Sequence, residues 1–143
     1  MKKQIDVPYF SQYTDLKDKY LALTSCGMMS LYMVLEYYKL KGLLKKTLPC
    51  PEEMVITGRE TENGYKPGIG WIHQYFVDVA KNYGIFSQRK EKLPDFSTIK
   101  HALGNENPIV ISVERRCLSG VSFHMVVLTG YEEDTSGNII NFF

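Results

Sequence analysis

The sequence has almost no excess charge and no long apolar run. Its 17 Lys and Arg residues stand against 16 Asp and Glu, a net charge of +1. This balance argues against a nucleic-acid-binding protein, since such proteins usually carry a basic excess. No apolar stretch approaches the roughly 20 residues that a membrane-spanning helix needs, so we predict no spanning segment.

No secretory leader is visible either. The start at Met1–Lys3 is positively charged, as in a signal peptide, but no apolar segment follows it. The sequence as written therefore predicts a cytoplasmic protein. A secreted or cell-surface location is expected instead if a leader preceded this sequence.

Cysteine and histidine are scarce, with three of each. An odd number of cysteines argues against a fully paired disulfide framework, and no two lie close enough for a metal knuckle. We therefore predict no metal and no cofactor, and a zinc site built from scattered ligands is the lesser alternative. A single reactive cysteine with a distant histidine is the sharper hypothesis. The residues concerned are Cys26, Cys50, Cys117, His73, His101 and His124.

What the sequence does contain is enough apolar and aromatic material for one folded domain. It has 143 residues, of which 44% are hydrophobic and 13% aromatic, and we assign residues 1–143 to a single domain. The first half has helical periodicity at about 25–40 and 72–83, with shorter helices from Pro51 and at 95–103. The segment 57–70 is rich in Gly, Glu, Thr and Pro and is expected to be a long surface loop. Trp71 and His73 are assigned to the helix that follows.

The pattern changes after Pro108. Residues 109–113 and 124–131 are β-branched runs, and 138–143 follows a polar turn as a third strand. Strands joined by short turns pair antiparallel. Helices followed by an antiparallel sheet give an α+β fold.

Cys26 is the best candidate for a reactive group. Thr24 or Ser25 is expected to cap the first long helix, which places Cys26 in its first turn. A helix N-terminus and a neighbouring imidazolium both favour the thiolate, which is the reactive form. A buried structural cysteine is the alternative, and His124, at the start of an apolar strand, is on periodicity alone better explained as a hydrogen-bonded core residue.

The order of motifs along the chain resembles one family. Gln12, then Cys26 and Gly27 at a helix start, then His124 before a β-branched strand resemble the papain-like cysteine peptidases related to the double-glycine leader peptidases of bacteriocin exporters, in the free-standing branch. The stretches that carry the resemblance are 7–12, 25–31, 70–73, 108–113 and 124–131.

The resemblance implies a papain-like fold with a helical lobe packed on an antiparallel sheet, and a role for each matched residue. Cys26 would be the nucleophile, and His124 would form an ion pair with it and protonate the leaving amine. Gln12 would donate its side-chain amide to the oxyanion. Such families orient the histidine with an Asp, typically followed by Pro. Asn141 is the best candidate for that role here, although a one-residue shift would turn Phe142 toward the ring instead.

The resemblance also implies a peptide or protein substrate, with small residues such as glycine before the cut. Three alternatives to a peptidase stay open. The first is a degenerate family member that binds peptides without cutting them, and the second is a Cys/His acyltransferase. The third is a protein with a zinc site built from scattered ligands. The sequence gives no prediction of the oligomeric state.

Overall fold

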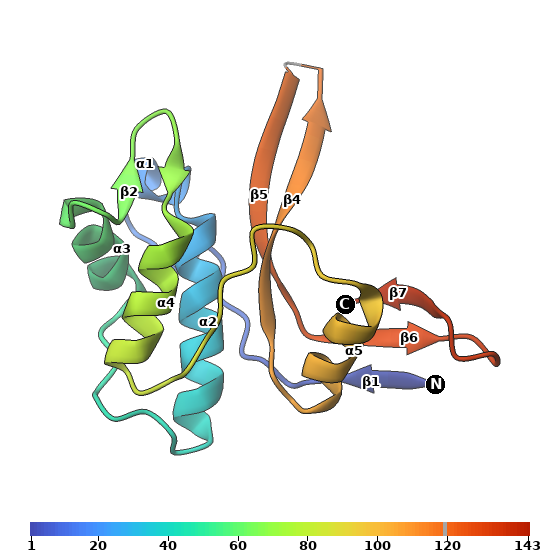
Figure 1. Ribbon diagram of the computed structural model, residues 1–143. Helices are drawn as coiled ribbons and strands as arrows, with labels where there is room; N and C mark the ends of the chain where they lie inside the picture. Colours follow the sequence, from blue (N-terminus) through green and yellow to red (C-terminus); the bar gives the residue numbers. More distant parts are fainter. Residues whose placement is uncertain (119) are drawn as a thin grey trace. The chain divides into compact units, whose positions relative to one another are not determined.

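Helices fill most of the first part of the chain and antiparallel strands the last, so the predicted α+β class is confirmed (Figure 1). The computed structural model describes residues 1–118 and 120–143, without the side chain of Cys117. Two compact units are formed, one by residues 8–89 and the other by residues 1–7 together with 90–143.

The first unit is built around helix α2 (Cys26–Leu40), which packs against α3 (Pro51–Glu60) and α4 (His73–Asn82) (Figure 1). Met28, Leu31 and Leu35 are all buried, as their helical spacing predicts. Burial is not confined to that stripe, however, because Met29, Tyr32, Val34 and Tyr37 are buried as well. A short helix, α1 (Lys19–Ala22), precedes α2 and was not predicted. Gly42, at a φ of +71°, follows the end of α2, as the sequence indicates.

Polar side chains are also buried along α2. The Tyr32 hydroxyl lies 3.1 Å from Glu36 Oε1, and Lys39 Nζ lies 2.8 Å from the same oxygen. Burial, followed by the hydrogen bond to Glu36, raises the pKa of Tyr32 above its ordinary value. The carboxylate of Glu36, only 9% exposed, is therefore paired rather than stranded in the core.

The expectation of a long surface loop at 57–70 is wrong in part. Helix α3 continues to Glu60, and the segment then forms a small hairpin of β2 (Tyr65–Lys66) and β3 (Gly70–Trp71). Trp71 therefore belongs to a strand, and only His73 belongs to α4, as its first residue. Gly58, one of the glycines that suggested a loop, instead allows close packing: a Cβ at this position would come within 2.7 Å of the Trp71 ring.

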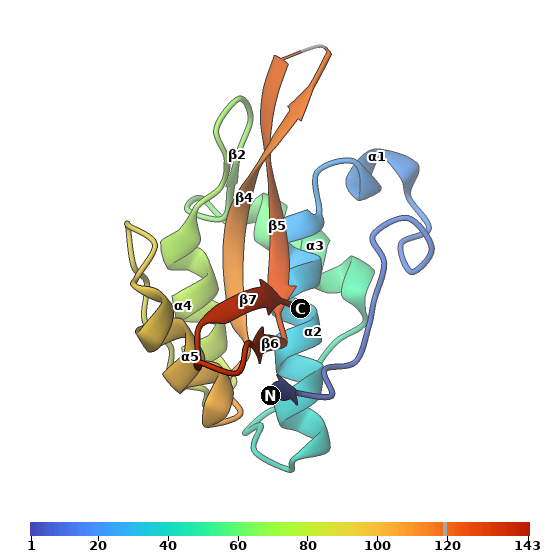
Figure 2. The ribbon, with the colours of Figure 1, turned by 90° about the vertical axis from the view of Figure 1, so that its right-hand side faces the viewer.

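The second unit holds the longer strands. β4 (Ile109–Cys117) and β5 (Gly120–Leu128) form a two-stranded antiparallel sheet in which Val113 pairs with His124. β6 (Gly130–Glu133) lies between β1 (Lys2–Gln4) and β7 (Ile139–Phe142) in a second antiparallel sheet (Figure 2). Helix α5 (Phe96–Gly104) packs against β6.

Two strand predictions need correction. The run 124–131 is divided at Thr129, because the chain there exchanges β4 for β1 as its partner: Ile5 N–H donates to the Thr129 carbonyl at 2.6 Å. β5 also begins earlier than predicted, at Gly120, so His124 lies within the strand rather than at its start. The Ser and Gly residues that follow Cys117 predict a loop there, but Cys117 is the last residue of β4.

Candidate functional site

Cys26 is the first residue of α2, as predicted, and its side chain is half-buried. The N-cap is Ser25, whose side chain makes no capping hydrogen bond; its hydroxyl donates instead to the carbonyl of Leu21. The N–H groups of the first helical turn have no partner within the helix itself. Ser25 therefore provides these N–H groups with no side-chain acceptor beside the thiol.

The turn before Cys26 is closely hydrogen-bonded. Thr24 N–H donates to the Leu21 carbonyl at 3.2 Å, and Met29 N–H donates to the Ser25 carbonyl at 2.9 Å. Asp18 caps α1, accepting from Tyr20 N–H at 2.8 Å. These bonds fix the direction in which the chain enters α2, and with it the place of the thiol.

Gln12 lies in the same unit and points toward that turn. It is 8% exposed, and its Nε2 donates to the carbonyl of Ala22 at 2.6 Å. An amide nitrogen carries two hydrogens, so this bond leaves one of them for another acceptor. Gln12 is therefore a buried, anchored side chain rather than an ordinary loop glutamine.

His124 lies in the other unit, near the middle of β5, and its ring is half-buried. Its side chain is on the face of β5 that also carries the buried Leu128, since side chains alternate along a strand. Cys26 and His124 belong to different units, so the contacts of each are given within its own unit.

Asn141 is exposed and pairs with Glu132 on β6. Its neighbour Phe142 points to the opposite face, where its ring packs edge-on against Phe96 of α5 with centroids 5.5 Å apart. Within the described part of this unit, no hydrogen bond joins the Asn141 amide to the His124 ring.

The sequence did not indicate two further side chains at the Cys26 turn. Trp71 Nε1 donates to the Thr24 carbonyl at 2.6 Å, and Arg59 Nη1 donates to Thr24 Oγ1 at 2.5 Å. Neither residue could be connected to Thr24 from the sequence, because no spacing rule relates positions so far apart.

Cys26 and Cys50 are free thiols, and Cys50 is exposed. The side chain of Cys117, predicted to be unreactive, lies outside the described residues. No cluster of three His, Cys, Asp or Glu side chains suited to a metal ion occurs within residues 1–118 and 120–143.

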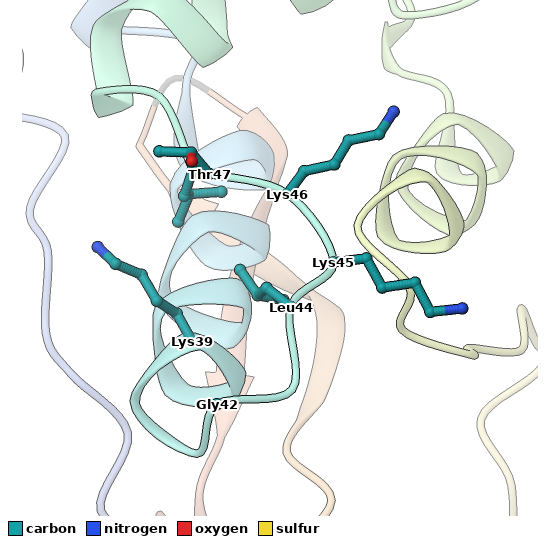
Figure 3. A pocket seen from close by; sticks show the side chains of 7 residues that line it. Lys39, Gly42, Leu44, Lys45, Lys46 and Thr47 are labelled. Carbon is teal, nitrogen blue, oxygen red and sulfur yellow. The ribbon is translucent and has the colours of Figure 1, made fainter.

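A cavity of about 390 Å³ lies at the end of α2, lined by Lys39, Gly42 and residues 44–48. Figure 3 shows the side chains of Lys39, Lys45 and Lys46 pointing in different directions, so their ammonium groups do not converge on one point. None of the four predicted site residues lines this cavity.

Comparison with known proteins assigns nearly the whole sequence to one family. Residues 4–141 match the model of the Peptidase_C39 like family. This chain belongs to the Peptidase_C39 like family. Searches of curated proteins and of solved structures returned no significant match.

Membership in the Peptidase_C39 like family indicates a function of the cysteine peptidase type, with a peptide or protein as substrate, and agrees with the papain-like α+β fold. None of the helices in the described part of the chain combines the length and hydropathy that crossing a bilayer would need.

Proposed function

We propose that this chain hydrolyses a peptide or related amide bond, with Cys26 as the nucleophile and His124 as its acid–base partner. The observation that carries the proposal is the place of Cys26: a half-buried thiol at the first position of α2, beside first-turn N–H groups that the N-cap residue Ser25 does not cap. A helix start of this kind favours the thiolate and offers donors to a nearby oxyanion.

The reaction proceeds in two halves. The thiolate of Cys26 attacks the carbonyl carbon, and the carbonyl oxygen becomes an oxyanion. His124 in its imidazolium form then protonates the nitrogen of the leaving amine, the C–N bond breaks, and a thioester remains on the sulfur. The neutral ring next takes a proton from water, whose oxygen attacks the thioester. The acid product leaves, and the thiolate–imidazolium pair is restored.

Gln12 and Asn141 have supporting roles in this proposal. The hydrogen of Gln12 Nε2 that Ala22 does not occupy would join the N–H of Cys26 at the oxyanion. Asn141 would accept a hydrogen bond from the ring of His124 and hold it in the productive tautomer. The resemblance to the double-glycine leader peptidases supports a preference for glycine or another small residue before the cut.

Alkylation provides the first test, because the chain contains an internal standard. Cys50 is an exposed free thiol, and an ordinary thiol is only about 1% ionised at pH 6.5. We expect iodoacetamide to modify Cys26 at that pH at least tenfold faster than Cys50, with the sites separated by peptide mapping. The substitution His124→Gln should remove the difference. Equal, slow labelling of both cysteines in the unaltered chain would contradict the proposal.

Hydrolysis is tested separately with a mixture of peptides that contain Gly-Gly and Gly-Ala bonds, analysed by mass spectrometry. Cleavage should be lost in Cys26→Ala and kept in Cys50→Ala. Fast labelling of Cys26 without cleavage of any peptide would favour the peptide-binding alternative. Transfer of the acyl group to an added amine in place of water would favour the acyltransferase.

A further inference from the structure

The residue that leads into the Cys26 turn is held by two side chains from distant parts of the same unit. Both acceptor groups of Thr24 are engaged, its carbonyl by the indole of Trp71 and its hydroxyl oxygen by the guanidinium of Arg59. These donors lie 47 and 35 positions away in the sequence. The segment once expected to be a loop therefore connects to the start of α2.

The Trp71 donor is itself firmly held. The ring is 8% exposed, lies edge-on to Tyr65 at 5.3 Å and stacks with Tyr75 at 6.5 Å. Gly58 lies so close to the indole that a methyl group there would overlap it. Close packing of this kind resists displacement, so the indole N–H is presented at a fixed point.

The Arg59 donor is held on the other side of the same cluster. Its guanidinium lies over the ring of Tyr65, 4.5 Å from the centroid, at the last turn of α3. A guanidinium stacked on an aromatic ring keeps its plane and still donates from its edge. Tyr65 thus contacts both donors, and the hairpin and α3 act on Thr24 together.

We propose that Trp71 and Arg59 are positioning residues for Cys26. They fix the Thr24 peptide, and thereby the place of the thiol and of the first-turn N–H groups of α2. The side chain of Ser25 does not cap that helix. The position of the Cys26 thiol therefore depends on the path of the backbone through Thr24. A misplacement of about 1 Å at a reacting group can cost roughly 100-fold in rate. This inference rests on the proposed role of Cys26.

The test uses four single substitutions in the full chain. Thr24→Val removes the hydroxyl acceptor but keeps the branched shape, and Thr24→Ser restores the acceptor. Trp71→Phe removes the indole N–H but keeps an aromatic ring. Val79→Ala, at a buried position on α4, weakens packing in the same unit without removing a group that bonds Thr24. Each variant is alkylated with iodoacetamide from pH 5 to 10, with Cys50 as internal standard, and its melting temperature is recorded.

Thr24→Val and Trp71→Phe should move the midpoint of the Cys26 alkylation profile upward by about 0.2 to 0.7 pH unit, since a displaced helix start stabilises the thiolate less. Thr24→Ser and Val79→Ala should leave the midpoint in place, even where Val79→Ala lowers the melting temperature. On cleaved peptides, the first two variants should lower kcat more than they raise KM.

Two outcomes would overturn the inference on its own account. One is an unchanged midpoint in both Thr24→Val and Trp71→Phe while Cys26 still reacts far faster than Cys50. The other is a midpoint that moves equally in Val79→Ala, which would mean that general loosening of the unit is the cause. If the unaltered chain labels Cys26 no faster than Cys50, the proposed function itself fails, and the positioning role fails with it.

Discussion

The side-chain amide of Gln12 donates a 2.6 Å hydrogen bond to the main-chain carbonyl of Ala22, on the turn that leads into Cys26. The bond anchors the amide and leaves its second hydrogen available. The same contact explains why a glutamine is buried here, since an unpaired buried amide would be costly. Gln12 therefore has two roles to distinguish by experiment: a structural role in binding the Ala22 carbonyl and a proposed catalytic role as a donor to the oxyanion.

We expect Gln12→Ala to lower kcat for peptide hydrolysis by about 100-fold to 1,000-fold, the usual effect of losing one oxyanion donor. Alkylation of Cys26 forms no oxyanion, so its rate should change little. Gln74→Ala is the matched control, because Gln74 is an exposed glutamine that bonds Asp78 on α4 of the same unit. A parallel fall in alkylation and hydrolysis would assign Gln12 a structural role only.

The proposed role of Asn141 in orienting His124 is tested by substitutions at Asn141 and, as a control, at its neighbour Ile140. Asn141→Ala should lower hydrolysis by about two orders of magnitude or more if it orients His124. Ile140→Ala, at an exposed position on the same strand, should have little effect. Asn141→Asp introduces the residue expected from the resemblance and should raise the rate above that of the unaltered chain. Full activity in Asn141→Ala would remove this residue from the mechanism.

Gly130 permits the close approach of β1 to β6. A Cβ at this position would lie 2.3 Å from the carbonyl oxygen of Lys3, which belongs to the backbone and cannot turn aside. We expect Gly130→Ala to destabilise the fold by about 1 to 3 kcal/mol, as overpacking does. Hydrogen exchange should show faster exchange at Lys2–Gln4 and Ile5. Gly104→Ala, where the nearest atom would be 3.9 Å away, is the control.

Alkaline pH should destabilise the helical unit through one buried and two half-buried tyrosines. Burial is the largest cause that raises the pKa values of Tyr32, Tyr38 and Tyr83 above the ordinary value near 10. The unfolded chain then releases these protons at a lower pH than the folded chain. Stability is therefore present in full below about pH 10 and falls as the pH rises above it.

Thermal unfolding between pH 8 and 11 measures this effect, with absorbance at 295 nm reporting tyrosine ionisation. Tyr32→Phe cannot ionise at that position, so its melting temperature should fall less steeply with pH than that of the unaltered chain. Equal slopes would show that Tyr32 contributes nothing to the alkaline loss.

Local patterns predicted most of the fold. Helical periodicity around Met28, Leu31 and Leu35 located α2 and placed Cys26 at its start, because both features depend on neighbouring residues. The β-branched runs located residues 109–113 of β4 and 124–128 of β5 for the same reason, but not the rest of these two strands. The break at Thr129 was missed, since it is imposed by a strand from the other end of the chain, and no local signal records that pairing.

The residues at the candidate site also fall into those that the sequence indicated and those that only the structure shows. Order along the chain singled out Cys26, His124 and Gln12, while the contact of Gln12 with Ala22 needed coordinates. Trp71 and Arg59 were missed at the Cys26 turn, because their link to Thr24 depends on how the hairpin folds back. The glycines at 58 and 64 were taken for loop residues, whereas Gly58 serves close packing.

The pairing of β1 with β6 has a consequence for how the protein is made. Lys3 pairs with Tyr131, so β1 is synthesised long before the strand that it pairs with. The helical unit, residues 8–89, is contiguous and is complete before β6 is made. We therefore expect the helical unit to collapse during translation while β1 is still unpaired, and the sheet unit to close only once β6 has been synthesised.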